Sequence, residues 1–67
     1  MTAILRIMAK MRIKRFYYRN LRIHTEIREM DGKLHGFYRT WHFNGHLAEE
    51  LRYRHGLLQG TSRQWDE

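Results

Sequence analysis

The sequence predicts an all-β protein, a single-layer antiparallel sheet built from repeated β-hairpins. Three observations predict this fold. A shift of 24 positions along the sequence aligns Gly32 with Gly56, and several other residues align with identical residues at the same shift. The dipeptide Asn44-Gly45 lies between two strand-like runs and is typical of a tight hairpin turn. An arginine also faces a glutamate at the same register in two predicted hairpins. With 67 residues, the chain holds one domain.

The repeat has the pattern G-x-L-x-G-x-x-R-x-W, which occurs at residues 32–41 and again at residues 56–65. A weaker copy lies upstream, where Tyr17 aligns with Trp41 and Asn20 with Asn44. Residues 14–67 therefore contain about two and a half hairpin units of period 24. Each unit contacts only its neighbours in such an array.

Residues 1–13 precede the repeats as an N-terminal segment. Ile4, Leu5 and Met8 fit one face of a short helix, with Thr2 as its cap. The run from Ile4 to Met8 fits a strand equally well. We favour a strand or extended segment, because the rest of the chain reads as strand.

The second hairpin is predicted to turn at Asn44-Gly45 as a type I′ turn, which needs positive φ at both central residues. This turn sets the register of the two flanking strands. It predicts three facing pairs: Trp41 with Ala48, Arg39 with Glu50, and Tyr38 with Leu51.

The first hairpin is predicted to turn at Asn20-Leu21, so that Arg15 faces Glu26 and Tyr18 faces Ile23. Leucine is costly at positive φ, so a longer turn is the alternative. The recurrence of the Arg–Glu pair supports the register, because opposite charges across two strands contribute roughly 0.2–1 kcal/mol.

Strand alternation places Phe37, Arg39 and Trp41 on one face and Tyr38 on the other. Apolar residues therefore occupy both faces, and packing between neighbouring hairpins is the simplest role for the aromatic rings. Gly32 and Gly56 are predicted to close the connecting turns. Gly36 and Gly60 are predicted to allow a close approach of backbone or rings.

The strand from Gly60 to Trp65 has no hairpin partner of its own in the sequence. Three alternatives remain: it pairs with the strand 47–53 as an edge, it pairs with a second copy, or the chain is a fragment of a longer array. Free strand edges recruit other strands. We favour self-association, and expect a homodimer through this C-terminal edge strand.

The chain is basic, with 13 Lys and Arg against seven Asp and Glu and a net charge of +6. The excess lies mainly between Arg6 and Arg28 and indicates nucleic acid, anionic lipid or an acidic protein as partner. Cysteine is absent, which excludes disulfides and thiolate zinc sites. No apolar stretch spans a membrane and no signal peptide is evident, so we expect a cytoplasmic protein.

A basic and aromatic stretch, Lys14 to Arg22, is the candidate nucleic-acid surface. Cations interleaved with rings can contact phosphates and stack on bases. The alternative is that the rings are core and the charges a solvated rim. The candidate nucleic-acid-binding residues are Arg15, Tyr17, Tyr18, Arg19 and Arg22.

Catalysis and metal binding are not expected. The five histidines show no compact ligand spacing, so neither a metal site nor a cofactor is predicted. Ser62 has no evident base, and the adjacent Glu49 and Glu50 point to opposite faces of a strand. We therefore expect a protein that is not an enzyme.

Several segments together carry a resemblance to a known family: residues 31–41, residues 44–47, and Glu50, Tyr53, Gly56 and Gly60. They resemble MORN-type repeats, and more closely the bacterial variant of the YwqK-family antitoxins. The resemblance implies a single-layer hairpin-repeat sheet that acts as a binding surface, no catalysis, and a role in neutralising a toxin. The first unit departs from it, with Met8 and Arg12 in the glycine positions and Leu21 in the turn.

The function expected from the sequence is protein binding by a small β-repeat protein that acts as an antitoxin or inhibitor. The partner is a protein, such as a toxin or a nucleoprotein. Tryptophan, tyrosine and arginine are favoured at interface hot spots, and the candidate contact residues are Phe37, Tyr38, Arg39 and Trp41. The alternative is a basic nucleic-acid-binding protein, including a phage-type inhibitor of a host nucleoprotein.

Overall fold

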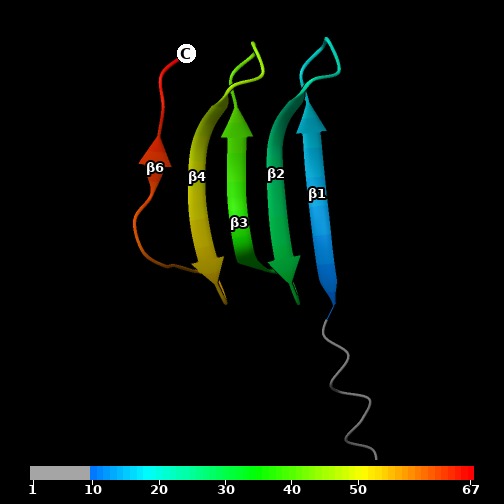
Figure 1. Ribbon diagram of the computed structural model, residues 1–67. Helices are drawn as coiled ribbons and strands as arrows, with labels where there is room; N and C mark the ends of the chain where they lie inside the picture. The colour runs from blue at the N-terminus through cyan, green and yellow to red at the C-terminus, as the bar shows by residue number, and fades with distance from the viewer. Residues whose placement is uncertain (1–9) are drawn as a thin grey trace, which may run out of the picture.

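The computed structural model describes residues 10–67, and these residues form strands and turns without a helix. The strands make one open antiparallel sheet in the order β1-β2-β3-β4-β5, and β6 also pairs with β4 (Figure 1). The strands are β1 (Met11–Tyr17), β2 (Ile23–Met30), β3 (Lys33–Trp41), β4 (Leu47–Arg54), β5 (Leu57–Leu58) and β6 (Arg63–Gln64). The predicted all-β fold, a single-layer antiparallel sheet of hairpins, is confirmed.

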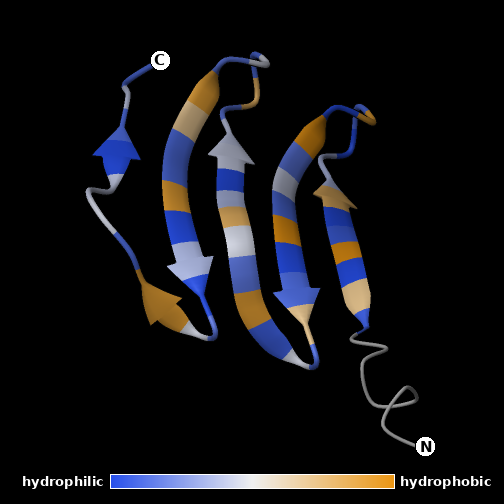
Figure 2. Ribbon diagram, turned by 60° about the horizontal axis from the view of Figure 1, so that its bottom comes forward, coloured by the Kyte–Doolittle hydropathy of each residue, from blue (hydrophilic) through white to orange (hydrophobic). Residues whose placement is uncertain are grey.

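The sheet has one layer and no enclosed core. Its shortest principal extent is 12 Å, whereas a second packed sheet would lie about 10 Å beyond the first. Hydrophilic and hydrophobic residues alternate along the strands (Figure 2). Among the described residues only Thr25 is buried, and no apolar side chain is. Both faces of the sheet therefore carry partly exposed apolar groups.

The turns at one end of the sheet are three-residue turns rather than the predicted type I′ turn. The His42 N–H donates to the His46 carbonyl oxygen at 2.8 Å, and the Gly45 N–H donates to the His42 carbonyl oxygen at 2.9 Å. Gly45 has a positive φ of 96°, and Asn44 is not among the positive-φ residues. This pattern is a type I turn closed by one left-handed residue. It adds one residue between the strands and so changes the pairing beside it.

The first hairpin repeats this turn with leucine in place of glycine. The Tyr18 N–H donates to the Arg22 carbonyl oxygen at 2.8 Å. Leu21 takes the left-handed position with φ 71°. The side chain of Asn20 accepts the N–H of Arg22 at 3.0 Å. The longer turn considered for this hairpin is therefore confirmed.

The turns at the opposite end of the sheet are the two-residue kind. Asp31 and Gly32 have φ values of 51° and 82°, and His55 and Gly56 have values of 49° and 84°. Both central residues are left-handed in each pair, as a type I′ turn requires. Gly32 and Gly56 close the connecting turns, as predicted.

The strand registers confirm the two predicted Arg–Glu pairs, Arg15 with Glu26 and Arg39 with Glu50. Tyr38 also faces Leu51 as predicted. Beside the three-residue turns, the predicted pairing of residues across the strands is wrong by one residue.

The two wrong pairs share one physical cause. Trp41 pairs with Leu47 rather than Ala48, and Tyr17 rather than Tyr18 pairs with Ile23. The register shifts between Thr40 and Trp41 and between Phe16 and Tyr17. The extra turn residue and these bulges move the pairing by one position.

The C-terminal residues pair within the sheet. β6 faces β4 through Glu49↔Gln64 and Glu50↔Arg63, and the Trp65 N–H donates to the Ala48 carbonyl oxygen at 2.8 Å. The strand is shorter than the predicted span from Gly60 to Trp65. Pairing with the strand 47–53, one of the three alternatives, is thus observed, whereas the expected homodimer stays a prediction.

The predicted division after residue 13 does not coincide with a strand boundary. β1 begins at Met11, so Met11 to Ile13 belong to the sheet. The expectations for Ile4, Leu5 and Met8 lie outside the described residues. Within residues 10–67, no helix reaches the length and apolar character needed to cross a membrane.

Candidate interaction surface

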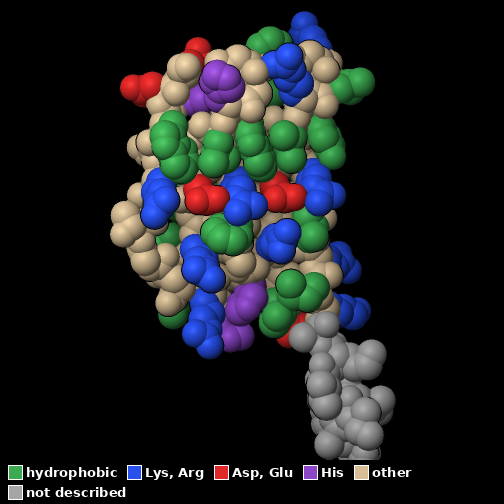
Figure 3. Space-filling model, in the orientation of Figure 1, with side chains coloured by type: hydrophobic (Ala, Val, Ile, Leu, Met, Phe, Trp, Pro, Cys, Tyr) green, Lys and Arg blue, Asp and Glu red, His purple; other side chains and the backbone are tan. Residues whose placement is uncertain are grey.

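One row of charged side chains crosses the whole sheet. Strand pairing places Arg15 opposite Glu26, Glu26 opposite Arg39, Arg39 opposite Glu50, and Glu50 opposite Arg63. Figure 3 shows these charges as a line of alternating blue and red. We call this row the charge ladder, and the side of the sheet that carries it the ladder face. Its members are Arg15, Glu26, Arg39, Glu50 and Arg63.

Four members of the charge ladder, Arg15 to Glu50, are joined by ion pairs. Arg15 Nε lies 2.9 Å from Glu26 Oε2, and Arg39 Nε lies 2.7 Å from Glu50 Oε2. Arg39 also reaches Glu26, with 3.9 Å between Nη1 and Oε1. The side chain of Glu26 is only 12% exposed, whereas that of Arg15 is 47% exposed. Glu26 thus has an arginine on each side, and these ion pairs link the four strands β1 to β4 electrostatically.

An apolar row runs beside the charge ladder on the same face. Tyr17 pairs with Ile23 and Trp41 pairs with Leu47. Trp65 follows β6 and is held to Ala48 by its backbone. Figure 3 shows this row in green next to the charges. Tyr17 is 56% exposed and Trp65 is 42% exposed, so the ladder face presents aromatic surface to solvent. The apolar row consists of Tyr17, Ile23, Trp41, Leu47 and Trp65.

A cluster of arginines around Phe37 also lies on the ladder face. The charge ladder separates this cluster from the apolar row. The guanidinium carbon of Arg39 lies 4.1 Å from the centre of the Phe37 ring, and that of Arg52 lies 5.4 Å from it. These distances are within the range of cation–π attraction. The side chain of Arg28 passes over Gly36, 3.4 Å from where a Cβ would stand, and its buried Nε has no partner among the described residues.

The role predicted for Gly36, a close approach of backbone or rings, is not observed, because the group beside its Cβ position is the side chain of Arg28, at 3.4 Å. The same role is wrong for Gly60, because nothing lies within 4 Å of its Cβ position. Arg28 and Arg52 were not among the predicted site residues. The repeat could have identified them, because they are equivalent positions and each stands two residues after a ladder glutamate.

The four predicted protein-binding residues divide between the two faces. Arg39 and Phe37 are in contact on the ladder face, and Trp41 belongs to the apolar row beside them. Tyr38 lies on the opposite face, where it pairs with Leu51 and its ring centre lies 6.4 Å from that of Tyr53. Three of the four therefore form one surface, and Tyr38 is not part of it.

The five predicted nucleic-acid-binding residues are also divided. Arg15 and Tyr17 lie on β1, and Arg15 is paired with Glu26. Tyr18, Arg19 and Arg22 lie outside the strands, in the first hairpin turn. Arg19 therefore lies beyond the end of β1 and does not share a strand face with Tyr17.

Two of these turn residues hold neighbouring turns together. The Tyr18 hydroxyl donates to the Trp41 carbonyl oxygen at 2.7 Å, and an Arg22 Nη donates to the Asn44 carbonyl oxygen at 2.6 Å. One repeat further on, His42 Nε2 lies 2.7 Å from the Trp65 carbonyl oxygen. These side chains connect the hairpins, so they are not free to bind phosphates.

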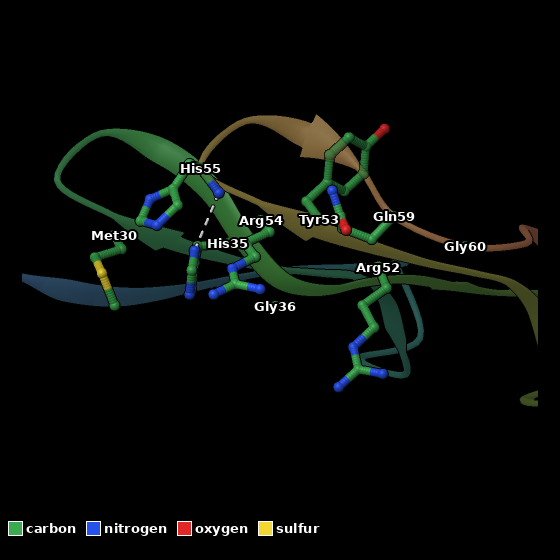
Figure 4. Close-up of a pocket in the computed structure, with 9 residues that line it drawn as sticks. All are labelled: Met30, His35, Gly36, Arg52, Tyr53, Arg54, His55, Gln59 and Gly60. Carbon is green, nitrogen blue, oxygen red and sulfur yellow. Dashed lines mark hydrogen bonds between the residues drawn. The ribbon is translucent and has the colours of Figure 1, made fainter.

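A shallow hollow of about 740 Å³ lies near the His55-Gly56 turn (Figure 4). His35 lies in β3, and its Nδ1 accepts the His55 N–H at 3.1 Å. Arg52 and Tyr53 point to opposite sides of the ribbon in Figure 4. No acid–base pair converges in the hollow. Its lining comprises Met30, His35, Gly36, Arg52, Tyr53, Arg54, His55, Gln59 and Gly60.

The adjacent carboxylates of β4 have separate roles. Glu50 belongs to the charge ladder. Glu49 faces the other way, where it accepts the Thr40 hydroxyl at 3.1 Å and the Gln64 amide at 3.3 Å. Within residues 10–67, no group of three or more His, Cys, Asp or Glu side chains is placed to hold a metal ion.

Comparisons with protein-family models, with curated proteins and with solved structures found no match.

Proposed function

We propose that this protein binds another protein through its ladder face. The observation that carries the proposal is the pair of parallel rows on that face, one apolar and aromatic, the other of alternating charge. In the described residues no apolar side chain is buried, so residues 10–67 do not themselves cover this surface. Tryptophan, tyrosine and arginine anchor many protein interfaces, and the rows contain all three.

The mixed charge of the ladder face favours a protein over a nucleic acid. Glu26 and Glu50 stand in the middle of the face, where they would repel a phosphate backbone. A protein partner can place opposite charges against both signs of the ladder. In addition, Tyr18 and Arg22 already have partners within the chain.

Nucleic-acid binding remains the second candidate, because the net charge is +6 and Arg28 and Arg52 lie on the ladder face. An antitoxin-like or inhibitor-like role is the form of protein binding that the resemblance to MORN-type repeats implies. A toxin or a nucleoprotein is the partner that such a role would require.

Affinity enrichment from a nuclease-treated lysate of the source cells tests the proposal. We expect a protein to be captured by the tagged full chain and by Tyr38→Ala, and to be lost with Trp41→Ala. The two substitutions are matched, because Tyr38 and Trp41 lie on the same strand and face opposite ways. Circular dichroism of both variants verifies that they are folded.

Two results would change the ranking of protein binding above nucleic-acid binding. Equal capture by both variants would contradict binding through the ladder face. Micromolar binding of single-stranded RNA or duplex DNA that collapses between about 50 and 200 mM salt would place nucleic acid first, because counterion release makes phosphate contacts strongly salt-dependent.

A further inference from the structure

Among the described residues, the outer edge of β1 has no neighbouring strand, so its outward backbone N–H and C=O groups are unpaired there. The Asp31 N–H donates to the Lys10 carbonyl oxygen at 3.0 Å, so Lys10 and Asp31 form a hydrogen-bonded pair. Inward and outward backbone groups alternate along an antiparallel strand. The alternate positions of β1 therefore direct their N–H and C=O groups away from β2. These residues are Met11, Ile13, Arg15 and Tyr17.

The side chains at the same four positions lie on the ladder face. The four positions are every second residue of β1 and include Arg15, and every second residue of a strand points to the same face. Every residue of β1 is exposed. A strand added at this edge would therefore continue the charge ladder and the apolar row by one more position. Strand addition of this kind is a recurrent mode of peptide recognition, in which main-chain hydrogen bonds supply affinity and alternate side chains supply specificity.

The charge ladder specifies the residue that such a strand needs. Arg39, inside the sheet, lies between the carboxylates of Glu26 and Glu50. Among the described residues, Arg15 has a carboxylate on one side only, namely that of Glu26 on the neighbouring strand β2. A new strand with an acidic residue opposite Arg15 and an apolar residue opposite Tyr17 would reproduce the pattern of β2 and β4.

A second copy of this chain does not fit that requirement. Either outer strand of a second copy would bring Arg15 or Arg63 to the ladder position, and like charges directly opposite each other are destabilising. The sequence of β1, MRIKRFY, has three cations and no carboxylate. The expected homodimer through the C-terminal edge meets the same repulsion when two copies pair in the register of the ladder.

From these observations we propose that the outer edge of β1 accepts an extended acidic segment of the partner protein, with an Asp or Glu opposite Arg15. This inference rests on the proposed protein-binding function and adds to it the chemistry of the partner.

A peptide titration followed by NMR tests the edge directly. The probe is a synthetic peptide of residues 45–56 of this chain, whose Glu50 occupies the ladder position, and its control is the same peptide with Glu50→Lys. We expect amide shifts and slowed hydrogen exchange at Ile13, Arg15 and Tyr17 of the labelled full chain. The glutamate peptide should bind about two- to tenfold more tightly than the lysine peptide, because one attraction is replaced by one repulsion.

The variant Arg15→Gln tests the role of the charge without introducing a new one. It should bind the two peptides within about twofold of each other, and its own NMR spectrum reports whether β1 stays folded. Equal binding of the two peptides by the wild-type chain, or shifts confined to strands other than β1, would overturn the proposal.

A proline variant separates this inference from the proposed function. Ile13→Pro removes an outward N–H and no bond to β2, and proline is tolerated at such edge positions. In the enrichment experiment we expect Ile13→Pro to lose the captured protein as Trp41→Ala does. Retention by Ile13→Pro with loss by Trp41→Ala would leave protein binding in place and refute the edge.

Discussion

At the scale of single residues, the clearest strain in the molecule is Leu21. It occupies the left-handed position that Gly45 fills in the equivalent turn, with φ values of 71° and 96°. A residue with a Cβ loses roughly 1–2 kcal/mol in that conformation. The Leu21 side chain is 82% exposed, so it gains little from packing.

The substitution Leu21→Gly should therefore stabilise the protein by about 0.5–1 kcal/mol, after the entropic cost of glycine is subtracted. Chemical denaturation monitored by circular dichroism measures this change. Gly45→Ala is the matched control and should destabilise by about 1 kcal/mol. An unchanged midpoint for Leu21→Gly would indicate that the first turn does not have this conformation.

At the candidate site, the sequence also predicted the pairing of individual charged residues correctly. Arg39 and Glu50, and Arg15 and Glu26, were paired correctly because opposite charges at equivalent positions of a repeat constrain the register. Trp41 was assigned the wrong partner because its position depends on a local backbone bulge. Whether the turn at Asn44-Gly45 takes two or three residues depends on the sign of φ at Asn44, which the dipeptide alone does not determine.

At the scale of strands, the charge ladder fixes how neighbouring hairpins align. Glu26 contacts an arginine on each neighbouring strand, Arg15 of β1 and Arg39 of β3. Slipping β1 or β3 by one residue would separate the arginine of that strand from Glu26 and transfer every side chain of that strand to the other face.

Glu26→Gln should accordingly destabilise the sheet by about 1 kcal/mol, and the loss should shrink in 1 M salt, where the Debye length falls to about 3 Å. Urea denaturation at low and high ionic strength, with potassium chloride as the salt, measures both effects. Glu29→Gln is the control, because Glu29 pairs at 3.4 Å with Lys14, whose side chain is 50% exposed. A loss that is equal for the two variants would contradict a special role of the ladder.

The repeat predicted the strands and their order more reliably than it predicted the surface they form. Period and alternation place Phe37 and Arg39 on one face, and both were in the predicted site. Tyr38 was included in the predicted site because it is aromatic. However, successive residues of a strand point to opposite faces, so Tyr38 lies on the face opposite Phe37 and Arg39. Arg28 and Arg52 were omitted because their place beside Phe37 depends on contacts across the strands.

At the scale of the whole molecule, the central feature is a sheet whose two faces are both left uncovered by residues 10–67. A chain of 67 residues has little surface to bury, and a small domain is correspondingly marginal in stability. The cross-repeat hydrogen bonds from Tyr18 to Trp41 and from His42 to Trp65 hold adjacent hairpins without a core. A protein that binds through such a sheet has its contact residues already aligned in rows.

This central claim is tested most directly by NMR of the isotope-labelled full chain with a soluble paramagnetic agent. We predict backbone NOEs from Glu26 to both Arg15 and Arg39, and similar broadening of the side-chain signals of Trp41 and Tyr38, which lie on opposite faces. Selective protection of Trp41 or Tyr38 would show that one face is covered. Absence of the NOEs between Glu26 and Arg39 would contradict the charge ladder itself.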